Sequence, residues 1–148
     1  MKTFALNKRA KYDYNILEIF EAGLVLKGYE VKAIKTGHIS LKGAYVIIKN
    51  NEAFLINADI PPYQPKNMPE NYNPSRTRKL LLHKKEIKSL IGKRKGEGLT
   101  LVAIKVYSKK GKLKLGFGIG QGKKKVDKRE LIKKREVKRE IEKKMKER

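Results

Sequence analysis

Residues 99–120 read LTLVAIKVYSKKGKLKLGFGIG, and this stretch decides the fold. Two apolar-rich runs, 99–107 and 113–119, flank the segment 109–111 (KKG), which is typical of a β-hairpin with a glycine in its turn. In the second run large apolar residues fill one face, while a lysine and glycines fill the other. Bare backbone on an outer face would let another group approach closely. The stretch therefore predicts two antiparallel strands with a glycine-rich outer face.

A second hairpin is expected in the first half of the chain. The β-rich runs 44–49 and 53–58 flank Asn50-Asn51, a pair that tolerates the positive φ of a tight turn. Residues 24–26 (LVL) also favour a strand. Short strands joined by hairpins and accompanied by a few helices suit a small closed barrel. We therefore predict a mainly β fold with flanking helices, organised as an antiparallel OB-like β-barrel.

Three segments carry helical signals. Residues 13–23 begin with a capping Asp, have apolar residues at 16, 17, 19 and 20, and end at a glycine, which predicts a short helix. Residues 29–35 (YEVKAIK) are ambiguous between a helix and a strand, and we favour the helix. Residues 73–92 combine an Asn N-cap, a proline at the first helical position and apolar residues at helical spacing. They predict one long helix with a basic face, and His83 would lie near its apolar face.

The charge of the chain is large and unevenly divided. Its 148 residues include 38 Lys+Arg and 15 Asp+Glu, a formal net charge of +23 at pH 7, which favours a polyanionic partner such as nucleic acid. Residues 1–120 carry 24 basic and 9 acidic side chains, and residues 121–148 carry 14 and 6. The second segment has few apolar residues. We expect a folded body, 1–120, and a basic C-terminal tail, 121–148, that is disordered alone and helical when bound.

The composition disfavours most enzymatic sites. There is no cysteine and only two histidines, and the carboxylates are scattered, which suits neither zinc, Ser-His-Asp nor two-metal chemistry. The glycine run 116–122 fails the spacing of a phosphate-binding loop, because Lys124 stands where a hydroxyl side chain is needed. No apolar stretch is long enough to span a membrane. We expect a cytoplasmic monomer with no catalytic residue, no metal or other cofactor and no membrane partner.

Basic residues interleaved with aromatic ones favour RNA or DNA, because Lys and Arg neutralise phosphates while Tyr rings stack on bases. The body has three such clusters, 7–12 (NKRAKY), 76–79 (RTRK) and 109–114 (KKGKLK). In the tail, Asp127 begins a capping-box arrangement, and pairs of Glu and Lys lie four residues apart. These contributions are small, so an isolated tail helix would be marginal.

Three stretches together resemble the SsrA-binding protein (SmpB) family, the partners of transfer-messenger RNA (tmRNA) in bacterial trans-translation. They are 7–35 (NKRAKYDYNILEIFEAGLVLKGYEVKAIK), 74–92 (PSRTRKLLLHKKEIKSLIG) and 122–130 (GKKKVDKRE). The resemblance implies an OB-fold body without catalytic activity that binds the tRNA-like domain of tmRNA. It also implies that the tail enters the decoding centre and the empty mRNA channel of the small ribosomal subunit, where it contacts ribosomal RNA.

The resemblance also assigns residues to the site in the body. The RNA-contacting positions of the family match Glu21, Leu81 and Lys114. For Glu21 two roles are open, because a carboxylate in an RNA site either accepts from a base or fixes nearby basic side chains. The full set expected at the tRNA-like domain is Asn7, Lys8, Arg9, Glu21, Arg76, Arg78, Leu81 and Lys114.

In the tail the resemblance assigns ribosome contacts to a Gly-Lys-Lys motif, an Asp-Lys-Arg motif and the basic residues that follow. These are Gly122, Lys123, Lys124, Asp127, Lys128, Arg129, Lys133, Lys134 and Arg135. Val126 stands where the family pattern has an aromatic residue or histidine, and Val137 where it has a bulky aromatic residue. We therefore expect the tail to engage mainly through phosphate contacts.

The expected function is that of an RNA-binding adaptor that delivers tmRNA to stalled ribosomes for ribosome rescue. A ribosomal or general RNA-chaperone protein of OB type is the alternative, with the same electrostatics but no single RNA partner. An RNA-processing enzyme is disfavoured, because the chain lacks clusters of carboxylates and histidines.

Overall fold

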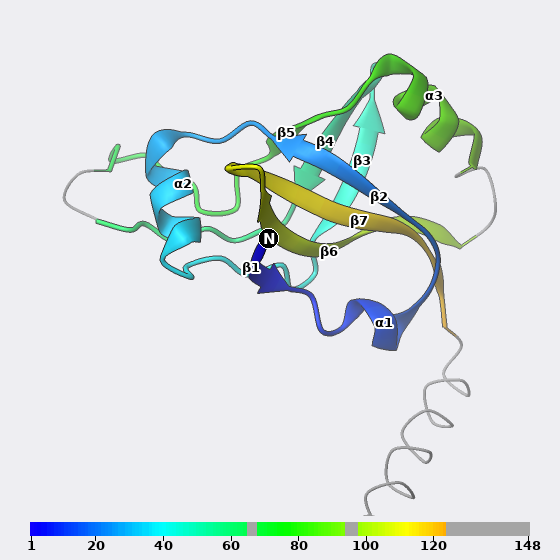
Figure 1. The fold of residues 1–148 in the computed structure, drawn as a ribbon, viewed down its shortest axis with the longest axis horizontal. Coiled ribbons are helices and arrows are strands. Elements are labelled where there is room, and N and C mark those ends of the chain that lie inside the picture. Colours follow the sequence, from blue (N-terminus) through cyan, green and yellow to red (C-terminus); the bar gives the residue numbers. More distant parts are fainter. Residues whose placement is uncertain (65–67, 94–97, 124–148) are drawn as a thin grey trace, which may run out of the picture.

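The structure is a computed structural model that describes residues 1–64, 68–93 and 98–123 (Figure 1). The strands in these ranges are β1 (Lys2–Leu6), β2 (Tyr14–Leu24), β3 (Tyr45–Lys49), β4 (Glu52–Ile56), β5 (Arg78–Leu81), β6 (Leu99–Lys109) and β7 (Lys112–Gly122). The helices are α1 (Ala10–Asp13), α2 (Gly28–Lys35) and α3 (Lys84–Lys93).

The strands form one antiparallel sheet in the order β1-β6-β3-β4-β5-β2-β7. Because β6 also pairs with β7, the sheet closes on itself, which removes most of its free edges. In Figure 1 the helices α2 and α3 lie on different sides of this barrel. The predicted mainly β, antiparallel barrel with flanking helices is confirmed.

Both predicted hairpins are present. Asn50 and Asn51 join β3 to β4 with φ values of 53° and 60°, and Lys110 and Gly111 join β6 to β7 with φ values of 51° and 75°. Positive φ at both central residues matches the right-handed twist of the flanking strands. Asn50 and Asn51 therefore form the tight turn that the sequence predicts.

The core is formed by the inward faces of the strands and by apolar side chains of the helices α2 and α3. Phe117 and Leu115 of β7 are completely buried, as are Ile34 of α2 and Leu90 of α3. Alternate residues of a strand point to opposite faces, which explains why the large apolar residues of β7 all point inward. Both helices are thus attached to the barrel by aliphatic packing.

The helix predicted at 13–23 is wrong, because these residues form most of β2. Ile16 pairs with Gly120 and Glu18 with Ile119, so Leu17 is the extra residue of a β-bulge. The bulge interrupts the strict alternation of the strand and places apolar residues at a spacing that resembles a helix. The helix favoured at 29–35 is confirmed as α2. Of the strand expected at 24–26, only Leu24 is in a strand, as the last residue of β2, and Val25 and Leu26 follow its end.

The long helix predicted at 73–92 is also wrong in part. Residues 78–81 form β5, which pairs with β4 and β2, and only α3 is helical. His83 precedes α3, and its side chain is 92% exposed rather than packed near an apolar face. Pairing of β5 between two other strands therefore overrides a local helical signal.

The glycine face of β7 is covered by the protein itself, which corrects the expectation of an open outer face. A Cβ atom at Gly118 would lie 2.8 Å from the carbonyl oxygen of Glu18 and 2.9 Å from Cγ2 of Ile16. At Gly120 it would lie 2.9 Å from Cβ of Tyr14. The glycines therefore allow the bulged backbone and the side chains of β2, the strand paired with β7, to lie closely against this face.

We expect Gly118→Ala to lower the free energy of unfolding by about 1–3 kcal/mol, because the added methyl group displaces the β2 backbone. Urea unfolding followed by circular dichroism would measure the loss. Gly28→Ala is the matched control, since no atom lies within 4 Å of its Cβ position and it begins a helix. Equal stability of the two variants would contradict this account of the glycine face.

The last strand continues past residue 120, where the sequence analysis divides body from tail, and that division stays a prediction. β7 continues to Gly122, and the backbone N–H of Lys123 donates to the carbonyl oxygen of Asp13 at 2.9 Å. Residues 124–148 lie outside the described ranges. None of the helices within those ranges has the length and apolarity that crossing a membrane requires.

Candidate nucleic-acid interface

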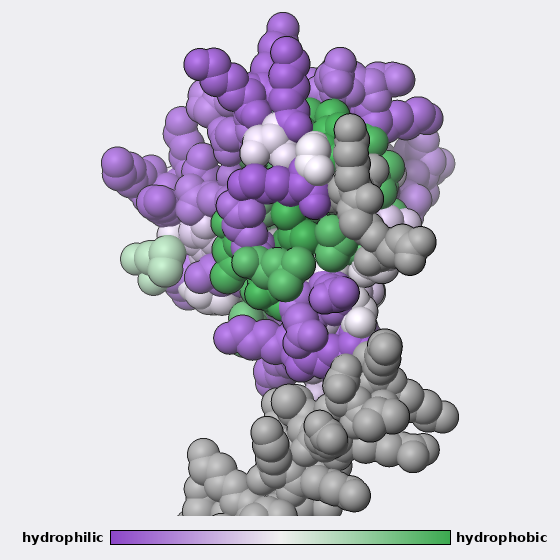
Figure 2. All heavy atoms as spheres, turned by 90° about the vertical axis from the view of Figure 1, so that its right-hand side faces the viewer, coloured by the Kyte–Doolittle hydropathy of each residue, from purple (hydrophilic) through white to green (hydrophobic). Residues whose placement is uncertain are grey.

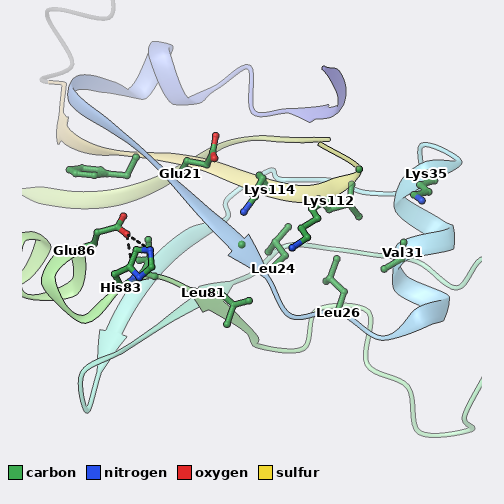
Figure 3. A pocket seen from close by; sticks show the side chains of 15 residues that line it. Glu21, Leu24, Leu26, Val31, Lys35, Leu81, His83, Glu86, Lys112 and Lys114 are labelled. Atoms are coloured by element: carbon green, nitrogen blue, oxygen red, sulfur yellow. Dashed lines mark hydrogen bonds and ion pairs between the residues drawn. The ribbon is translucent and has the colours of Figure 1, made fainter. Parts of the chain in front are cut away.

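One pocket of the described structure, here called the main pocket, has a volume of about 890 Å³ and is lined by residues of five elements, of which α3 contributes Glu86. β2 contributes Glu21, α2 contributes Val31 and Lys35, β5 contributes Leu81, and β7 contributes Lys114 (Figure 3). The three residues that the resemblance singled out, Glu21, Leu81 and Lys114, therefore line one pocket despite their distance along the chain. Their role as RNA contacts stays a prediction.

The main pocket combines apolar surface with basic side chains. Leu81 is 56% exposed, and Leu24 and Leu26 lie beside it. Lys112 and Lys114 approach from the β6–β7 hairpin (Figure 3). Lysines neutralise phosphates, and exposed apolar side chains pack against unstacked bases and riboses. The pocket can therefore hold a single-stranded or looped segment of nucleic acid.

Glu21 is held in place by Tyr107 and Lys109. The phenolic O–H of Tyr107 donates to Oε2 of Glu21, and Lys109 Nζ donates to the same oxygen at 3.5 Å. The hydrogen bond from Tyr107 lowers the pKa of Glu21, and burial together with Glu21 raises the pKa of Tyr107. Glu21 is consequently ionised at neutral pH and acts as an acceptor. Sequence reasoning missed Tyr107, whose only signal was its place beside the basic turn 109–111.

The predicted residues near the N-terminus lie outside the main pocket. Asn7 is 91% buried, and its Nδ2 donates to the carbonyl oxygen of Ala103 at 2.8 Å, so it fastens the end of β1 to β6. Lys8 and Arg9 are exposed, and they line a separate groove with Lys42. The guanidinium of Arg9 stacks on the ring of Tyr12 at 4.8 Å. The Arg9 guanidinium also pairs with Asp13 at 3.3 Å. RNA contact by Lys8 and Arg9 stays a prediction, whereas the Asn7 side chain has a structural role.

Arg78 corrects the sequence analysis, because its side chain is completely buried and cannot reach RNA from the surface. β5 alternates, so Arg78 and Leu80 point inward while Lys79 and Leu81 point outward. Nη1 of Arg78 donates to the carbonyl oxygen of Ala58 at 2.6 Å. The guanidinium of Arg78 therefore binds acceptors in the protein interior.

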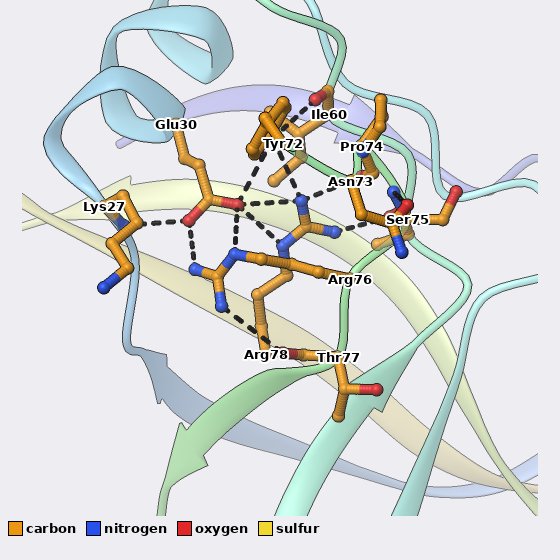
Figure 4. A network of polar contacts seen from close by, with 11 residues as sticks. Lys27, Glu30, Ile60, Tyr72, Asn73, Pro74, Ser75, Arg76, Thr77 and Arg78 are labelled. Carbon is orange, nitrogen blue, oxygen red and sulfur yellow. Dashed lines mark hydrogen bonds and ion pairs between the residues drawn. The ribbon is translucent and has the colours of Figure 1, made fainter. Parts of the chain in front are cut away.

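The partner of Arg78 is Glu30 of α2, a buried carboxylate that the sequence analysis did not single out. Nε of Arg78 donates to Glu30 Oε2 at 2.9 Å, and Nε of Arg76 donates to the same oxygen at 3.0 Å (Figure 4). Lys27 N–H donates to Oε1 at 2.8 Å, and the hydroxyl of Tyr72 also reaches Oε2. We call these five residues the Glu30 network. Arg76 remains 29% exposed at its side chain, so only part of it faces solvent.

Opposing influences act on the ionisation of Glu30. Burial alone raises its pKa, but hydrogen bonds from Arg76, from the backbone N–H of Lys27 and from Arg78 outweigh burial, so the pKa of Glu30 is lowered. Glu30 is therefore an anion that balances one of two guanidinium charges. A signal was present in the sequence, because Glu30 shares one helical face with the core residues Ala33 and Ile34.

The base of the tail adjoins an apolar groove on a different part of the surface. Ile16, Ile19 and Ile104 line this groove together with Lys11 and Lys123. Figure 2 shows an apolar patch in the middle of a largely hydrophilic face. Lys123 Nζ donates to the carbonyl oxygen of Lys11 at 2.8 Å. The expected tail contacts Lys124, Asp127, Lys128, Arg129, Lys133, Lys134 and Arg135 lie outside the described residues, as do Val126 and Val137.

A closed β-barrel that carries a lysine-rimmed apolar pocket and a large positive charge belongs to the class of nucleic-acid-binding proteins. Within residues 1–64, 68–93 and 98–123, no three His, Cys, Asp or Glu side chains come together as a metal would require. Residues 4–147 match the family model described as "SmpB protein", and the chain belongs to this family.

Individual relatives agree with the family model over almost the whole chain. The sequence is 51% identical over 140 residues to the SsrA-binding protein of Enterococcus faecalis, covering 95% of this chain and 90% of that protein. It is 47% identical over 148 residues to the SsrA-binding protein of Thermosynechococcus vestitus, covering 100% and 97%. The fold matches a solved chain described under "tmRNA-SmpB: a journey to the center of the bacterial ribosome" with a TM-score of 0.67 at 44% identity, covering 81% of this chain and 84% of that chain. The resemblance noted from the sequence is confirmed.

Proposed function

We propose that this protein is a non-enzymatic adaptor that binds the tRNA-like domain of tmRNA and delivers it to stalled ribosomes for trans-translation. The observation that carries the proposal is the meeting of Glu21, Leu81 and Lys114 in one pocket of a chain that belongs to the SmpB family. Its relatives include SsrA-binding proteins and a chain solved in a study of tmRNA-SmpB on the ribosome, which supports the same partner.

Different residues of the main pocket bind different parts of the RNA in this proposal. Lys112 and Lys114 bind phosphates, while the exposed face of Leu81 packs against an unstacked base or ribose. Glu21 accepts a hydrogen bond from a base and keeps its geometry through Tyr107. A looped RNA presents such bases and a regular duplex does not, so the pocket favours a tRNA-like fold over a duplex.

The tail supplies the second RNA contact in this proposal. Residues 124–148 carry 13 basic and 6 acidic side chains and would contact ribosomal RNA at the decoding centre, in the channel left empty of message. Contacts of this kind are mostly with phosphates, so they tolerate Val126 and Val137. An adaptor with this task works in the cytoplasm and needs no catalytic group.

We expect Leu81→Ala to weaken binding of a tRNA-like hairpin by roughly tenfold, because the truncation removes apolar contact worth about 1–2 kcal/mol, at about 0.8 kcal/mol for each buried CH₂ group. The slope of affinity against salt should not change, since no charge is removed. Fluorescence anisotropy at several salt concentrations measures both quantities. Leu17→Ala is the matched control, because Leu17 is 60% exposed on β2 and does not line the main pocket.

The same titrations separate the proposal from its alternative. A specific adaptor binds the tRNA-like hairpin far more tightly than a duplex of equal length, and the preference survives moderate salt. Equal affinity for the two RNAs, with Leu81→Ala indistinguishable from Leu17→Ala, would instead favour a ribosomal or general RNA-chaperone protein.

A further inference from the structure

Glu30 lies behind the main pocket, and its carboxylate reaches three of the segments that form the pocket. We propose that Glu30 is a positioning residue for RNA recognition, which holds α2 and β5 in the geometry that the RNA requires. The proposal rests on the proposed function, because it assumes that the main pocket is the RNA site. Glu30 itself is completely buried and does not touch RNA.

Glu30 and its partners Lys27 and Arg78 lie on segments that carry residues of the pocket. On its own helix, Glu30 precedes Val31, and Lys35 lies one turn further on. Lys27, whose N–H donates to Oε1 at 2.8 Å, follows Leu26. Figures 3 and 4 show these segments from the pocket side and from the network side. The Glu30 carboxylate therefore connects the first turn of α2 to Lys27, the residue that precedes the helix.

The third connection runs to β5. Arg78 donates to Glu30 at 2.9 Å and lies on the same short strand as Leu81, the most exposed apolar residue of the main pocket. Nη2 of Arg78 also donates to the carbonyl oxygen of Pro74 at 2.8 Å, which fixes the segment leading into β5. The relative position of Leu81 and Val31 thus depends on the Glu30–Arg78 pair.

α2 needs such a connection more than the strands do. It has eight residues, too few for a stable helix in isolation, so tertiary contacts decide its orientation. Ala33 and Ile34 anchor one side of it in the core. On the neighbouring side the ring of Tyr29 packs edge to face on Tyr72 at 5.2 Å, and Tyr72 belongs to the Glu30 network. Aliphatic packing fixes the depth of α2, and the Glu30 network fixes its rotation.

Positioning and simple electrostatics predict opposite effects when Glu30 loses its charge. Glu30→Gln raises the net charge of a strongly basic protein by one, so general attraction to RNA stays equal or increases. The same change weakens the hydrogen bonds that hold Arg76 and Arg78, because charge-assisted bonds are the stronger kind. If Glu30 positions the pocket, the amide variant binds the tRNA-like RNA less well despite its extra positive charge.

The experiment compares two affinities of the full chain, one for a tRNA-like hairpin and one for a duplex of equal length. We expect Glu30→Gln to reduce the preference for the hairpin by about fivefold or more. Partial unfolding would also lower the preference, because the charge that attracts a duplex does not depend on the fold. Circular dichroism and urea unfolding therefore establish first that the variant is folded under the assay conditions, so that the ratio reports on the pocket. Glu52→Gln is the matched control, since Glu52 is an exposed carboxylate on β4 that pairs with Lys79 at 3.5 Å.

A milder variant keeps the proposal testable if Glu30→Gln does not fold. Tyr72→Phe removes a hydroxyl that lies 3.4 Å from Oε2 of Glu30, accepts from Arg78 at 3.3 Å and donates to the carbonyl oxygen of Ile60 at 2.7 Å. It leaves all charges in place and should reduce the preference by about twofold. The positioning role is overturned if a folded Glu30→Gln protein prefers the hairpin as strongly as the wild type does. If only Tyr72→Phe folds, an unchanged preference in that variant overturns it. If the wild-type protein itself binds both RNAs equally, the proposed function fails instead, so the two failures are distinguishable.

Discussion

Replacing Arg78 with methionine is expected to lower the free energy of unfolding by about 3–5 kcal/mol, because it breaks a buried ion pair from one side. Glu30 would keep Arg76 as its one ion-pair partner in the described structure, and the carbonyl oxygens of Ala58 and Pro74 would lose donors that now lie 2.6 and 2.8 Å away. Methionine fills much of the same volume, so the loss reports on polar contacts rather than on a cavity. The cost is a large share of the total stability of a small domain.

Chemical unfolding of the full chain in urea, followed by circular dichroism, measures this loss. Lys79→Met is the control, because Lys79 is the next residue of β5 and forms an exposed pair with Glu52. An exposed pair contributes about 0–1 kcal/mol, so the control should be nearly as stable as the wild type. A similar small loss for Arg78→Met would show that the Glu30 network does not stabilise the body.

The parts of the fold that sequence could predict are those governed by local backbone chemistry. The turn at Asn50-Asn51 and the turn at Lys110-Gly111 were predictable because few residues adopt positive φ at low cost. The hairpins follow from these turns and from the alternation of their strands. The barrel class follows in turn from the number of short strands.

The errors arise where pairing between distant strands decides the local structure. Residues 14–24 pair along β7, and the bulge at Leu17 disguises the strand pattern as a helical one. β5 is only four residues long and lies between β4 and β2, so its local propensity has little influence. No pattern within either segment contains this information.

The candidate site also has residues that could be predicted from the sequence and residues that only the tertiary structure brings together. Glu21, Leu81 and Lys114 were found through the family resemblance, and the fold explains their grouping because β2, β5 and β7 meet at one pocket. Arg78 was assigned to RNA because a basic cluster in the sequence does not show which of its side chains alternate inward. Glu30 lies far from Arg76 and Arg78 along the chain, so only the tertiary structure brings them together.

Truncation after Lys123 is expected to leave the affinity for a tRNA-like hairpin within about threefold of the wild type at 0.15 M salt, where charges more than about 8 Å apart are largely screened. The main pocket lies within the remaining chain, and the two hydrogen bonds of Lys123 to Lys11 and Asp13 are kept. Tagging of nascent chains on stalled ribosomes should be abolished, because the residues proposed to contact ribosomal RNA are gone. Anisotropy and a reconstituted tagging reaction measure the two effects.

A chain whose residues 124–148 are shuffled at constant composition tests whether charge alone accounts for the tail. Such a tail keeps every basic side chain, and Gly122 and Lys123 stay in place, but it loses the Asp-Lys-Arg order, the capping arrangement at Asp127 and the regular Glu-Lys spacing. If phosphate contacts in any arrangement suffice, the shuffled tail restores tagging; if a helix must form on the ribosome, it does not.

Loss of hairpin affinity by more than about tenfold on truncation would mean that the tail belongs to the tmRNA site, because removal of general charge alone has a weaker effect at this salt concentration.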